Sequence, residues 1–311
     1  MQIINLKDTH LDLPPCVASI GFFDGVHRGH QHLIHSLMQH AKEAEMASMV
    51  ITFGKHPRQV VQPAFVPQLL TTHEEKLRLL AATGVDYCVV LPFDKEMAAM
   101  SAQTFMQKVL KERLNVVRLL IGYDNRFGHN RSEGFSDYCR YGAEMDIEVH
   151  EATGYEEGGV RMSSSLIRQS LAQGDVRMAH HCLGYAYSLS GRVVKGFEEG
   201  RKLGYPTANI SMNDIPQIIP AKGVYIVEVE VEDFAQRMVG MTCIGTRPTY
   251  GGSHLTVETH ILDFSNDIYD KEITIRFVDR IRDELKFDSI EALKEKMRED
   301  ETITRARVMS W

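Results

Sequence analysis

Two histidines lie three residues apart in a glycine-rich string, Gly21-Phe-Phe-Asp-Gly-Val-His27-Arg-Gly-His30, between a short apolar run and a helical pattern. Glycines in such a turn let backbone N–H groups come close to a phosphate, and the following helix adds a favourable dipole. The imidazoles of His27 and His30 can both reach one bridging oxygen, where they would stabilise charge on a leaving pyrophosphate. The string therefore predicts a phosphate site.

Histidines are concentrated in this part of the chain. Of 14 histidines, 12 precede residue 184, and five of those fall within 14 residues: His27, His30, His32, His35 and His40. A zinc site or a solvated helix face would also explain this cluster, because Zn²⁺ favours imidazole. The flanking glycines and the strand–turn–helix context favour phosphate.

A second polar cluster, Arg161-Met-Ser163-Ser164-Ser165-Leu-Ile-Arg168, opens another helical pattern. Hydroxyl groups at the start of a helix cap its free N–H groups, and the same geometry can bind phosphate. Arg168, one turn into the helix, would add a cation on that side. A plain serine cap with a surface arginine is the simpler interpretation of these residues alone.

Oxygen donors end a glycine-rich stretch of the second half, which reads Gly191-Arg-Val-Val-Lys-Gly196 and then Gly200-Arg-Lys-Leu-Gly204-Tyr-Pro206-Thr207-Ala-Asn209. Thr207 and Asn209 offer two side-chain oxygens two residues apart. Mg²⁺ takes few such protein ligands and fills its shell with phosphate and water. An ordinary loop with a turn asparagine is the alternative.

A carboxylate lies in the strand-like segment 256–264. Alternation places Glu258 and His260 on one face, and Val257, Thr259 and Ile261 on the other. A carboxylate beside a bound hydroxyl can act as general base in phosphoryl transfer. Without further context, an exposed strand glutamate is the simpler interpretation.

The elements that must position these groups differ between the two halves. Apolar runs at 17–20, 48–53, 87–91 and 116–122 alternate with helical patterns at 32–47, 74–83, 101–114 and 163–173. Unbroken apolar strands between helices predict a parallel sheet covered on both faces, with ligands at the carboxyl ends of its strands.

From about residue 188 the strands are short and rich in Val, Ile and Thr. They are expected at 191–195, 225–231, 238–244, 256–262 and 272–277. No helical period intervenes, which predicts an antiparallel unit closing into a barrel. A final helix is expected over 289–298 with Ser289 as N-cap. We therefore expect two domains, 1–184 and 185–311.

Composition narrows the classes of partner and compartment. Residues 1–183 carry 18 basic and 21 acidic side chains, and residues 184–311 carry 17 and 21, so neither half predicts a nucleic-acid surface. The five separated cysteines, Cys16, Cys88, Cys139, Cys182 and Cys243, indicate reduced thiols. We expect no signal peptide, no membrane span and a cytoplasmic location.

The string from Gly21 to His30 resembles the nucleotidyl-transfer signature of the adenylyltransferase module in bifunctional riboflavin kinase/FAD synthetases. The resemblance implies that His27 and His30 contact ATP phosphates and that Asp24 shapes the turn. It also places these residues in the nucleotide site: Gly21, Phe23, Gly25, Gly29, Ser164, Ser165 and the catalytic Arg168. Ser165 stands where the family usually has Thr.

The segment from Ile121 to Gly128 resembles a family segment in the flavin and nucleotide cleft. That resemblance implies flavin contacts for Asp124 and Phe127, with Asn125 replacing the usual aromatic. A buried core phenylalanine is the commoner explanation of Phe127. His56 follows another strand end and is a weaker candidate for the same site.

The stretch ending at Asn209 resembles the riboflavin kinase signature G-R-x-L-G-F-P-T-A-N, with Tyr205 in place of Phe. This resemblance implies that Thr207 and Asn209 hold Mg²⁺ and ATP phosphates, and that Glu258 activates the ribityl hydroxyl. The remaining implied contacts are Gly196, Gly204 and Pro206 for the nucleotide, and Arg282 and Phe287 for the flavin.

Together the motifs predict an α/β protein, with a Rossmann-like nucleotidyltransferase domain followed by an antiparallel β-barrel domain and a C-terminal helix. The expected activity is phosphorylation of riboflavin to FMN with ATP, then adenylylation of FMN to FAD with release of pyrophosphate. A homo-oligomer is compatible with this expectation. Two other hypotheses are a monofunctional enzyme with a decayed second domain and a non-catalytic flavin- or nucleotide-binding protein.

Overall fold

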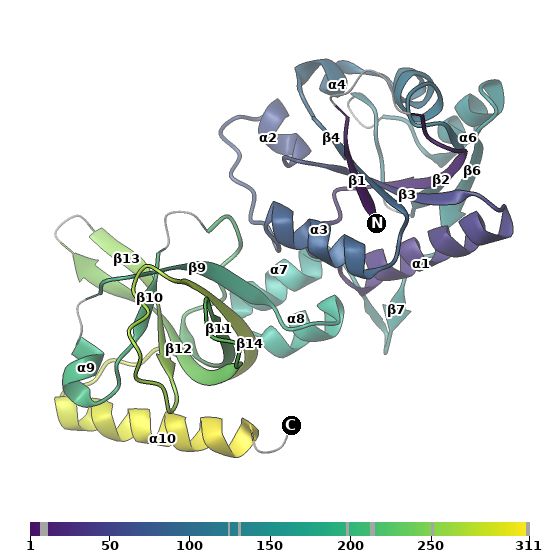
Figure 1. Ribbon diagram of the computed structural model, residues 1–311. Coiled ribbons are helices and arrows are strands. Elements are labelled where there is room, and N and C mark those ends of the chain that lie inside the picture. Colours follow the sequence, from purple (N-terminus) through teal and green to yellow (C-terminus); the bar gives the residue numbers. More distant parts are fainter. Residues whose placement is uncertain are drawn as a thin grey trace. The chain divides into compact units, whose positions relative to one another are not determined.

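The computed structural model describes residues 1–6, 12–123, 125–129, 132–196, 199–211, 215–249 and 252–308 (Figure 1). The chain divides into two compact units, Met1–Ser164 and Ser165–Trp311. Residues 165–183, which the sequence grouped with the parallel sheet, thus pack with the second unit. The functional boundary near residue 184 stays a prediction.

The first unit is built on a six-stranded parallel sheet in the order β1-β4-β3-β2-β5-β6. Its strands are β1 (Gln2–Asn5), β2 (Cys16–Ile20), β3 (Ala47–Phe53), β4 (Tyr87–Leu91), β5 (Val116–Gly122) and β6 (Glu148–Ala152). The predicted parallel sheet is confirmed. The edge strands β1 and β6 were not expected, because each carries polar residues that hide the pattern of a buried strand.

Helices cover both faces of this sheet, as Figure 1 shows for α1 and α3 on one side and α4 and α6 on the other. The helices of the unit are α1 (Arg28–Glu43), α2 (Pro57–Val61), α3 (His73–Ala82), α4 (Lys95–Ala99), α5 (Ala102–Phe105), the π-helix η2 (Met106–Lys111) and α6 (Phe135–Glu144). Val17 packs with Leu33 and Leu37 of α1, whereas Ala18 packs in the opposite cluster with Phe105.

The first long helix differs from its predicted range, 32–47. It begins at Arg28 and ends at Glu43, and Ala47 already belongs to β3. Glu45 takes a left-handed φ of 51°, and Met46 N–H donates to the carbonyl of Ala41 at 2.9 Å, which ends the helix.

The second unit is a closed antiparallel barrel in the order β10-β13-β12-β11-β14-β9, as the sequence predicted. Its strands are β9 (Ser188–Val194), β10 (Ala208–Ile210), β11 (Gly223–Val231), β12 (Met238–Thr249), β13 (Gly252–Ile261) and β14 (Glu272–Arg282). Its helices are α7 (Ser164–Gln173), α8 (Val176–Leu183), α9 (Glu199–Leu203) and α10 (Ile290–Val308). A small hairpin, β7 (Glu156–Glu157) and β8 (Val160–Arg161), belongs to the first unit.

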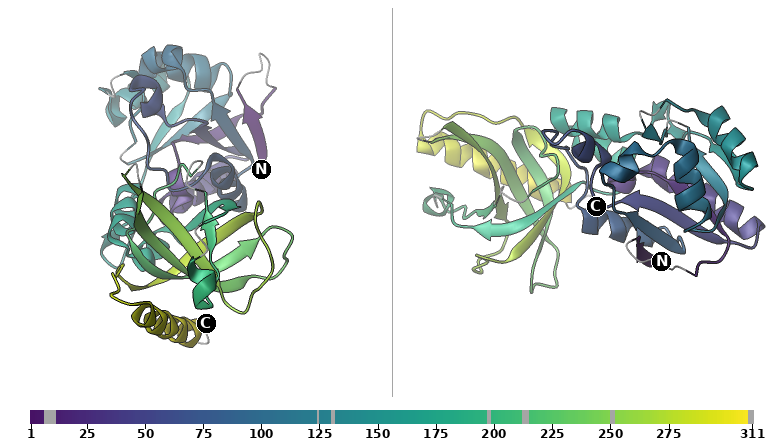
Figure 2. Two further views of the ribbon diagram at one scale, coloured as in Figure 1. Left: turned by 90° about the vertical axis from the view of Figure 1, so that its left-hand side faces the viewer. Right: turned by 90° about the horizontal axis from the view of Figure 1, so that it is seen from above.

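Helices α8 and α10 are tied to β14 of the barrel. The Asp279 carboxylate accepts from Arg177 of α8 at 2.7 Å and also from Arg307 of α10. Figures 1 and 2 show α10 lying along the outside of the barrel. The last helix extends well past its predicted end, and Ser289 caps it as expected, its hydroxyl accepting from Ala292 N–H at 3.1 Å.

All five cysteines are free thiols. Among the described residues, no helix has both the length and the apolar character that crossing a bilayer would require.

Candidate active sites

The histidine-bearing turn, which carries His27 and His30, follows the carboxyl end of β2. At β2 the order in which successive strands are added to the sheet reverses. Strands β3 and β4 follow on one side of β2, and β5 and β6 lie on the other. Open parallel sheets bind ligands at such a switch point. The turn continues through a 3₁₀ segment, Asp24–Val26, into α1.

Three residues of this turn have left-handed backbone: Phe23 (φ 54°), Gly25 (φ 75°) and Val26 (φ 37°). A bulky residue at positive φ costs of order 1–3 kcal/mol, so the surroundings must hold the turn in place. The buried Asp24 carboxylate does so by accepting the N–H groups of Leu70 (3.0 and 3.1 Å) and Thr71 (3.3 Å). Asp24 thus shapes the turn from inside the protein.

His27 caps α1, and its ring stacks on His30. The N–H of His30 donates to Nδ1 of His27 at 3.3 Å, and the ring centroids lie 3.7 Å apart with planes at 20°. Because Nδ1 accepts, the ring proton of neutral His27 lies on Nε2, where it can be donated to an anion. The stacking also disfavours charge on both rings at once. The two predicted histidines therefore form one unit with a defined donor.

Gly29 lies against the His27 ring, and Ser164 contacts the backbone of the turn. A Cβ on Gly29 would lie 3.1 Å from the His27 ring and 3.2 Å from the carbonyl oxygen of Met162, so a larger residue would crowd His27. The Ser164 hydroxyl donates to the Asp24 carbonyl at 3.2 Å. Ser165 and Arg168 belong to α7 in the second unit, where Ser165 is exposed and Arg168 half-buried.

The segment after β5 reaches the same strand end. The Asn125 amide donates to the carbonyl of Ile20, the last residue of β2. The Phe127 ring stacks on Tyr138 with centroids 4.3 Å apart, and its N–H donates to the Tyr138 hydroxyl at 3.0 Å. Asp124 lies outside the described residues. Phe127 thus has a core partner on one face, and flavin contact by this residue stays a prediction.

A buried lysine, which the sequence analysis did not single out, lies against this turn. Lys76 of α3 is 3% exposed, and burial lowers its pKa from 10.5 to about 8, with attraction by Asp24 acting in the opposite direction. Its signal in the sequence was its place one turn before the buried Leu80, on the face where a helix normally carries apolar residues.

The three other histidines of this cluster, His32, His35 and His40, have surroundings that differ from those of His27 and His30. His32 Nε2 lies 3.5 Å from the Thr153 hydroxyl, and with His35 it lines a cavity of about 620 Å³ beside α1. The His40 ring lies 5.3 Å from that of His150. Within the described part of the chain, no group of three or more His, Cys, Asp and Glu side chains is placed to hold a metal ion.

The second candidate site lies on the outer face of the barrel. Asn209 of β10 stands directly opposite Glu258 of β13, and the Thr207 hydroxyl donates to Glu258 Oε2 at 3.4 Å. The predicted alternation is observed, because Val257, Thr259 and Ile261 are buried while Glu258 and His260 are half-buried. The fold therefore brings the hydroxyl, amide and carboxylate together.

Two glycines and a histidine shape this cluster. A Cβ on Gly196 would meet the Asn209 amide within 2.3 Å, so only glycine fits there unless Asn209 moves. Gly204 has a left-handed φ of 86°. His260 Nδ1 donates to the carbonyl of Pro206 at 2.8 Å, which fixes the residue before Thr207.

A cavity of about 190 Å³ adjoins this cluster. Its lining includes Pro206, Thr207, Arg201, Asp267 and Tyr269. The cavity therefore places a cation and a hydroxyl, together with an aromatic ring, next to the predicted nucleotide-binding loop.

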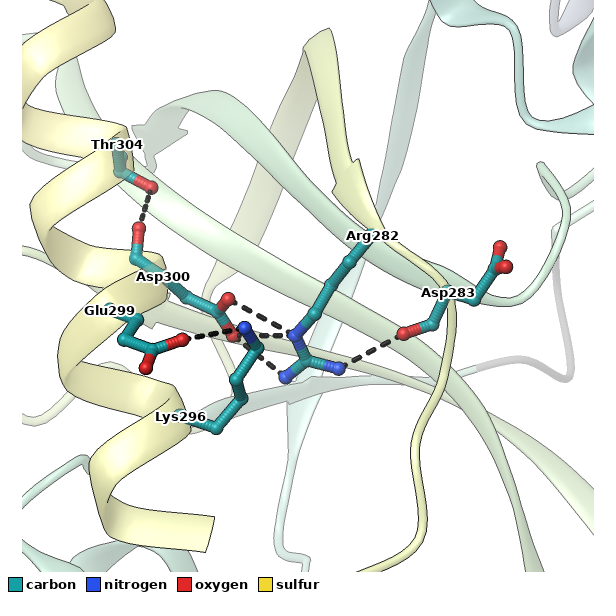
Figure 3. A network of polar contacts seen from close by, with 6 residues as sticks. All are labelled: Arg282, Asp283, Lys296, Glu299, Asp300 and Thr304. Atoms are coloured by element: carbon teal, nitrogen blue, oxygen red, sulfur yellow. Dashed lines mark hydrogen bonds and ion pairs between the residues drawn. The ribbon is translucent and has the colours of Figure 1, made fainter. Parts of the chain in front are cut away.

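Arg282, predicted to contact flavin, is held by α10 (Figure 3). Its guanidinium donates to both Asp300 oxygens at 2.7–3.0 Å and to the carbonyl of Asp283 at 3.0 Å. Arg282 lies 5.8 Å from the centroid of the Phe287 ring. The Arg282 and Asp300 side chains are 16% and 3% exposed, so this is a buried bidentate pair.

Known proteins match nearly the whole length of the chain. The FAD synthetase family model matches residues 10–166, and the riboflavin kinase model matches residues 183–308. The bifunctional riboflavin kinase/FMN adenylyltransferase of Escherichia coli (strain K12) is 39% identical over 290 residues, which cover 93% of this chain and 92% of that protein. The protein of the same name from Pseudomonas fluorescens is 36% identical over 313 residues, covering 98% and 97%.

A solved structure shares the fold. The crystal structure of a protein described as a macrolide-efflux protein from Streptococcus pneumoniae matches with a TM-score of 0.88 and 32% identity, over 97% of this chain and 98% of its own. That likeness supports the fold, whereas the family rests on the models and the named relatives. The two family models match consecutive parts of the chain, and the named relatives align with nearly all of it. The chain therefore belongs to the family of bifunctional riboflavin kinase/FMN adenylyltransferases.

Proposed function

We propose that this chain phosphorylates riboflavin to FMN with ATP and then joins FMN to the AMP part of a second ATP, giving FAD and pyrophosphate. The observation that carries the proposal is that each unit holds its own set of groups suited to one step. The first unit has the stacked pair His27 and His30, and the second has Thr207, Asn209 and Glu258. The order of the two family models supports the same assignment.

In the adenylyl step, an oxygen of the FMN phosphate attacks the α-phosphorus of ATP and pyrophosphate leaves from the opposite side. Nε2–H of His27 donates to the leaving oxygen as negative charge builds on it, and His30 supports the same charge. Gly21, Gly25 and Gly29 let the backbone approach the phosphates. We assign Ser164, Ser165 and Arg168 to the nucleotide phosphates on the motif resemblance.

In the kinase step, the ribityl hydroxyl attacks the γ-phosphorus of ATP, its proton passes to Glu258, and ADP leaves. The Glu258 carboxylate is partly exposed on the barrel face, so a substrate hydroxyl can approach it. Gly196, Gly204 and Pro206 hold the loop against the nucleotide. Arg282 and Phe287 are assigned to the flavin.

Mg²⁺ fits the donor set of the barrel. The Thr207 hydroxyl and the Asn209 amide oxygen are the hard oxygen donors that Mg²⁺ accepts, and both lie beside the Glu258 carboxylate. Bound with ATP, the ion would neutralise phosphate charge. Thr207 and Asn209 would hold it.

The functional modules are proposed as residues 1–184 and 185–311. Helices α7 and α8 then belong to the first module by function, through Ser164, Ser165 and Arg168, although residues 165–183 pack with the second unit. A cytoplasmic location is proposed on the five free cysteines, three of which, Cys16, Cys88 and Cys182, are buried.

Product analysis tests the proposal. Pure protein is incubated with riboflavin, ATP and Mg²⁺, and flavins are separated by chromatography over time. FMN should appear first and FAD after it, with pyrophosphate formed in step with FAD. FMN without FAD, or FAD only from supplied FMN, would instead support the monofunctional alternative. Absence of both products would contradict the enzyme assignment.

A further inference from the structure

Lys76 is a buried cation to which neither reaction step assigns a role. Its ammonium donates to the carbonyl of Phe22 at 3.2 Å, to the Thr52 hydroxyl at 3.2 Å and to the carbonyl of Phe53 at 2.9 Å. Lysine has three donors, and all three find oxygen acceptors. A buried ammonium is costly unless it is hydrogen-bonded, and here each of its donors has an oxygen partner.

These acceptors join two strand ends. Phe22 follows β2, and Phe53 is the last residue of β3, the neighbouring parallel strand. The Thr52 hydroxyl itself donates to the Phe22 carbonyl at 3.1 Å, so one small network binds both carbonyls. Lys76 thereby fixes where the chain leaves the sheet at the ends of β2 and β3, next to the histidine-bearing turn.

The lysine also contacts a ring of this turn. Its Nζ lies 4.3 Å from the Phe22 centroid, and the Phe22 ring makes an edge contact with His56 at 4.7 Å. Phe22 directly precedes Phe23, the first left-handed residue, and lies five positions before His27. A turn with three left-handed residues needs external restraint, and the contacts of Lys76 supply it from the side of α3.

The charged and titratable groups that face Lys76 leave it positive at neutral pH. Asp24 attracts it from the turn. On β4, burial raises the pKa of the Cys88 thiol to about 11, so that thiol is neutral. On its own helix, burial and Lys76 itself lower the pKa of His73 below 6.5, so His73 adds no charge above neutrality. The ammonium loses its proton near pH 8.

We propose that Lys76 is a positioning residue for adenylyl transfer, which holds the ends of β2 and β3 so that His27 and His30 meet the departing pyrophosphate. The inference rests on the proposed assignment of FMN adenylylation to this turn. The protonated form matters because only an ammonium has a donor for each of its three acceptors. An apolar side chain would remove this donor from the Phe53 carbonyl and would leave the Phe22 carbonyl with the Thr52 hydroxyl alone.

The test compares Lys76→Met, Lys76→Arg and a matched control, Arg78→Met, whose side chain on the same helix is 69% exposed. Full-length proteins convert FMN to FAD with MgATP, and riboflavin phosphorylation is measured in the same samples. At pH 7, Lys76→Met should lower kcat for FAD formation by roughly 10- to 100-fold with little change in the KM for ATP, because misplacement affects the transition state more than binding. Lys76→Arg should recover part of this loss, and riboflavin phosphorylation should not change.

The pH profile separates positioning from mere stability. The ratio of the unmodified rate to the Lys76→Met rate should be largest at pH 7 and shrink above pH 8, where Lys76 is no longer charged. If Lys76→Met does not fold, Thr52→Val, which removes one partner and keeps the lysine, should give an intermediate fall in kcat. A normal FAD rate in both variants, or a ratio independent of pH, would overturn the inference. Failure of the unmodified protein to make FAD would instead overturn the proposed function.

Discussion

His27 accepts the backbone N–H of His30 through Nδ1, and the two rings stack at 3.7 Å. One hydrogen bond thus sets the tautomer of His27, while the stacking sets the position of both rings. In the neutral ring the proton then lies on Nε2, the nitrogen that the proposed mechanism uses as donor. The same contact makes positive charge on both imidazoles at once unfavourable.

Replacing His30 should therefore block the second step alone. In the proposed mechanism, His30→Ala removes a group that stabilises charge on the leaving pyrophosphate, and it also leaves the His27 ring without its stacking partner. We expect a fall of roughly 10²- to 10³-fold in FAD formation, with FMN accumulating from riboflavin. Chromatography of the flavins measures this, and His32→Ala, on the same helix, is the matched control. Normal FAD formation by His30→Ala would refute the assignment.

Replacing Glu258 should have the opposite effect. Glu258→Gln keeps the size and hydrogen bonding of the side chain but removes the proton acceptor, so riboflavin phosphorylation should fall by about 10²- to 10⁴-fold. FAD formation from supplied FMN should persist. The control is Glu272→Gln, an exposed glutamate on another barrel strand that pairs with Arg192 at 3.6 Å. If Glu258→Gln phosphorylated riboflavin at the full rate, the base would have to be a different group.

Cys243 offers a chemical probe of the same face. It is exposed on β12 and stands directly opposite Glu258, whereas Cys16, Cys88 and Cys182 are buried. Alkylation by N-ethylmaleimide should place bulk beside Glu258 and stop riboflavin phosphorylation while sparing FAD formation from FMN. Mass spectrometry counts the modified thiols.

Two comparisons test whether the loss of activity comes from alkylation of Cys243. Cys243→Ser should phosphorylate riboflavin with or without the reagent, and MgATP should slow the loss of activity in the unmodified protein. Full kinase activity in protein that is stoichiometrically alkylated at Cys243 would show that this face does not bind substrate.

Sequence patterns predicted most of the fold, because apolar runs and turn residues encode local geometry. Strands β4 and β5 match their predicted ranges, and the barrel follows from short strands without intervening helices. Spacing and resemblance also singled out His27, His30, Thr207 and Glu258, whereas the ring stacking and the Thr207–Glu258 hydrogen bond were not predicted.

What the sequence did not provide were contacts between distant segments. Lys76 and Phe22 are 54 positions apart, and a lysine on a helix normally indicates a solvated face. The pairing of Arg282 with Asp300 is equally non-local, and it shows that an arginine chosen by motif can also serve to dock a helix. Helix α8 was missed because its eight residues are too short for a clear period.

The Arg282–Asp300 pair should contribute strongly to the stability of the barrel. Asp300→Ala leaves the mostly buried guanidinium of Arg282 without its carboxylate and with only the Asp283 carbonyl as acceptor, and breaking a buried ion pair in this way typically costs about 3–5 kcal/mol of unfolding free energy. Urea unfolding followed by circular dichroism measures the loss. Glu299→Gln, one residue away, removes an exposed ion pair with Lys296 and should cost less than about 1 kcal/mol. Equal losses of unfolding free energy in the two variants would contradict the view that burial decides how much an ion pair contributes to stability.

Lys76 should make the stability of the first unit depend on pH in a predictable direction. Its pKa is lowered from 10.5 to about 8 in the folded protein, so between these values the unfolded chain binds a proton that the folded chain does not. Stability from this group therefore rises with pH over that window, by up to about 3 kcal/mol at 1.4 kcal/mol per pKa unit. The Cys16 and Cys88 thiols oppose this trend above pH 9, because their folded pKa values are raised to about 11.

Comparison with Lys76→Met removes the contribution of the lysine and keeps Cys16 and Cys88 in both proteins, while it also removes the attraction of Lys76 for the Cys88 thiolate. From pH 7.5 to 10, the difference in unfolding free energy between the unmodified protein and this variant should shift by roughly 2–3 kcal/mol in favour of the unmodified protein. Urea unfolding at several pH values measures the shift, and Arg78→Met should show none. Parallel stability curves for the unmodified protein and Lys76→Met would mean that Lys76 has its ordinary pKa. The lysine would then not be buried against the histidine-bearing turn in the way that the structure places it.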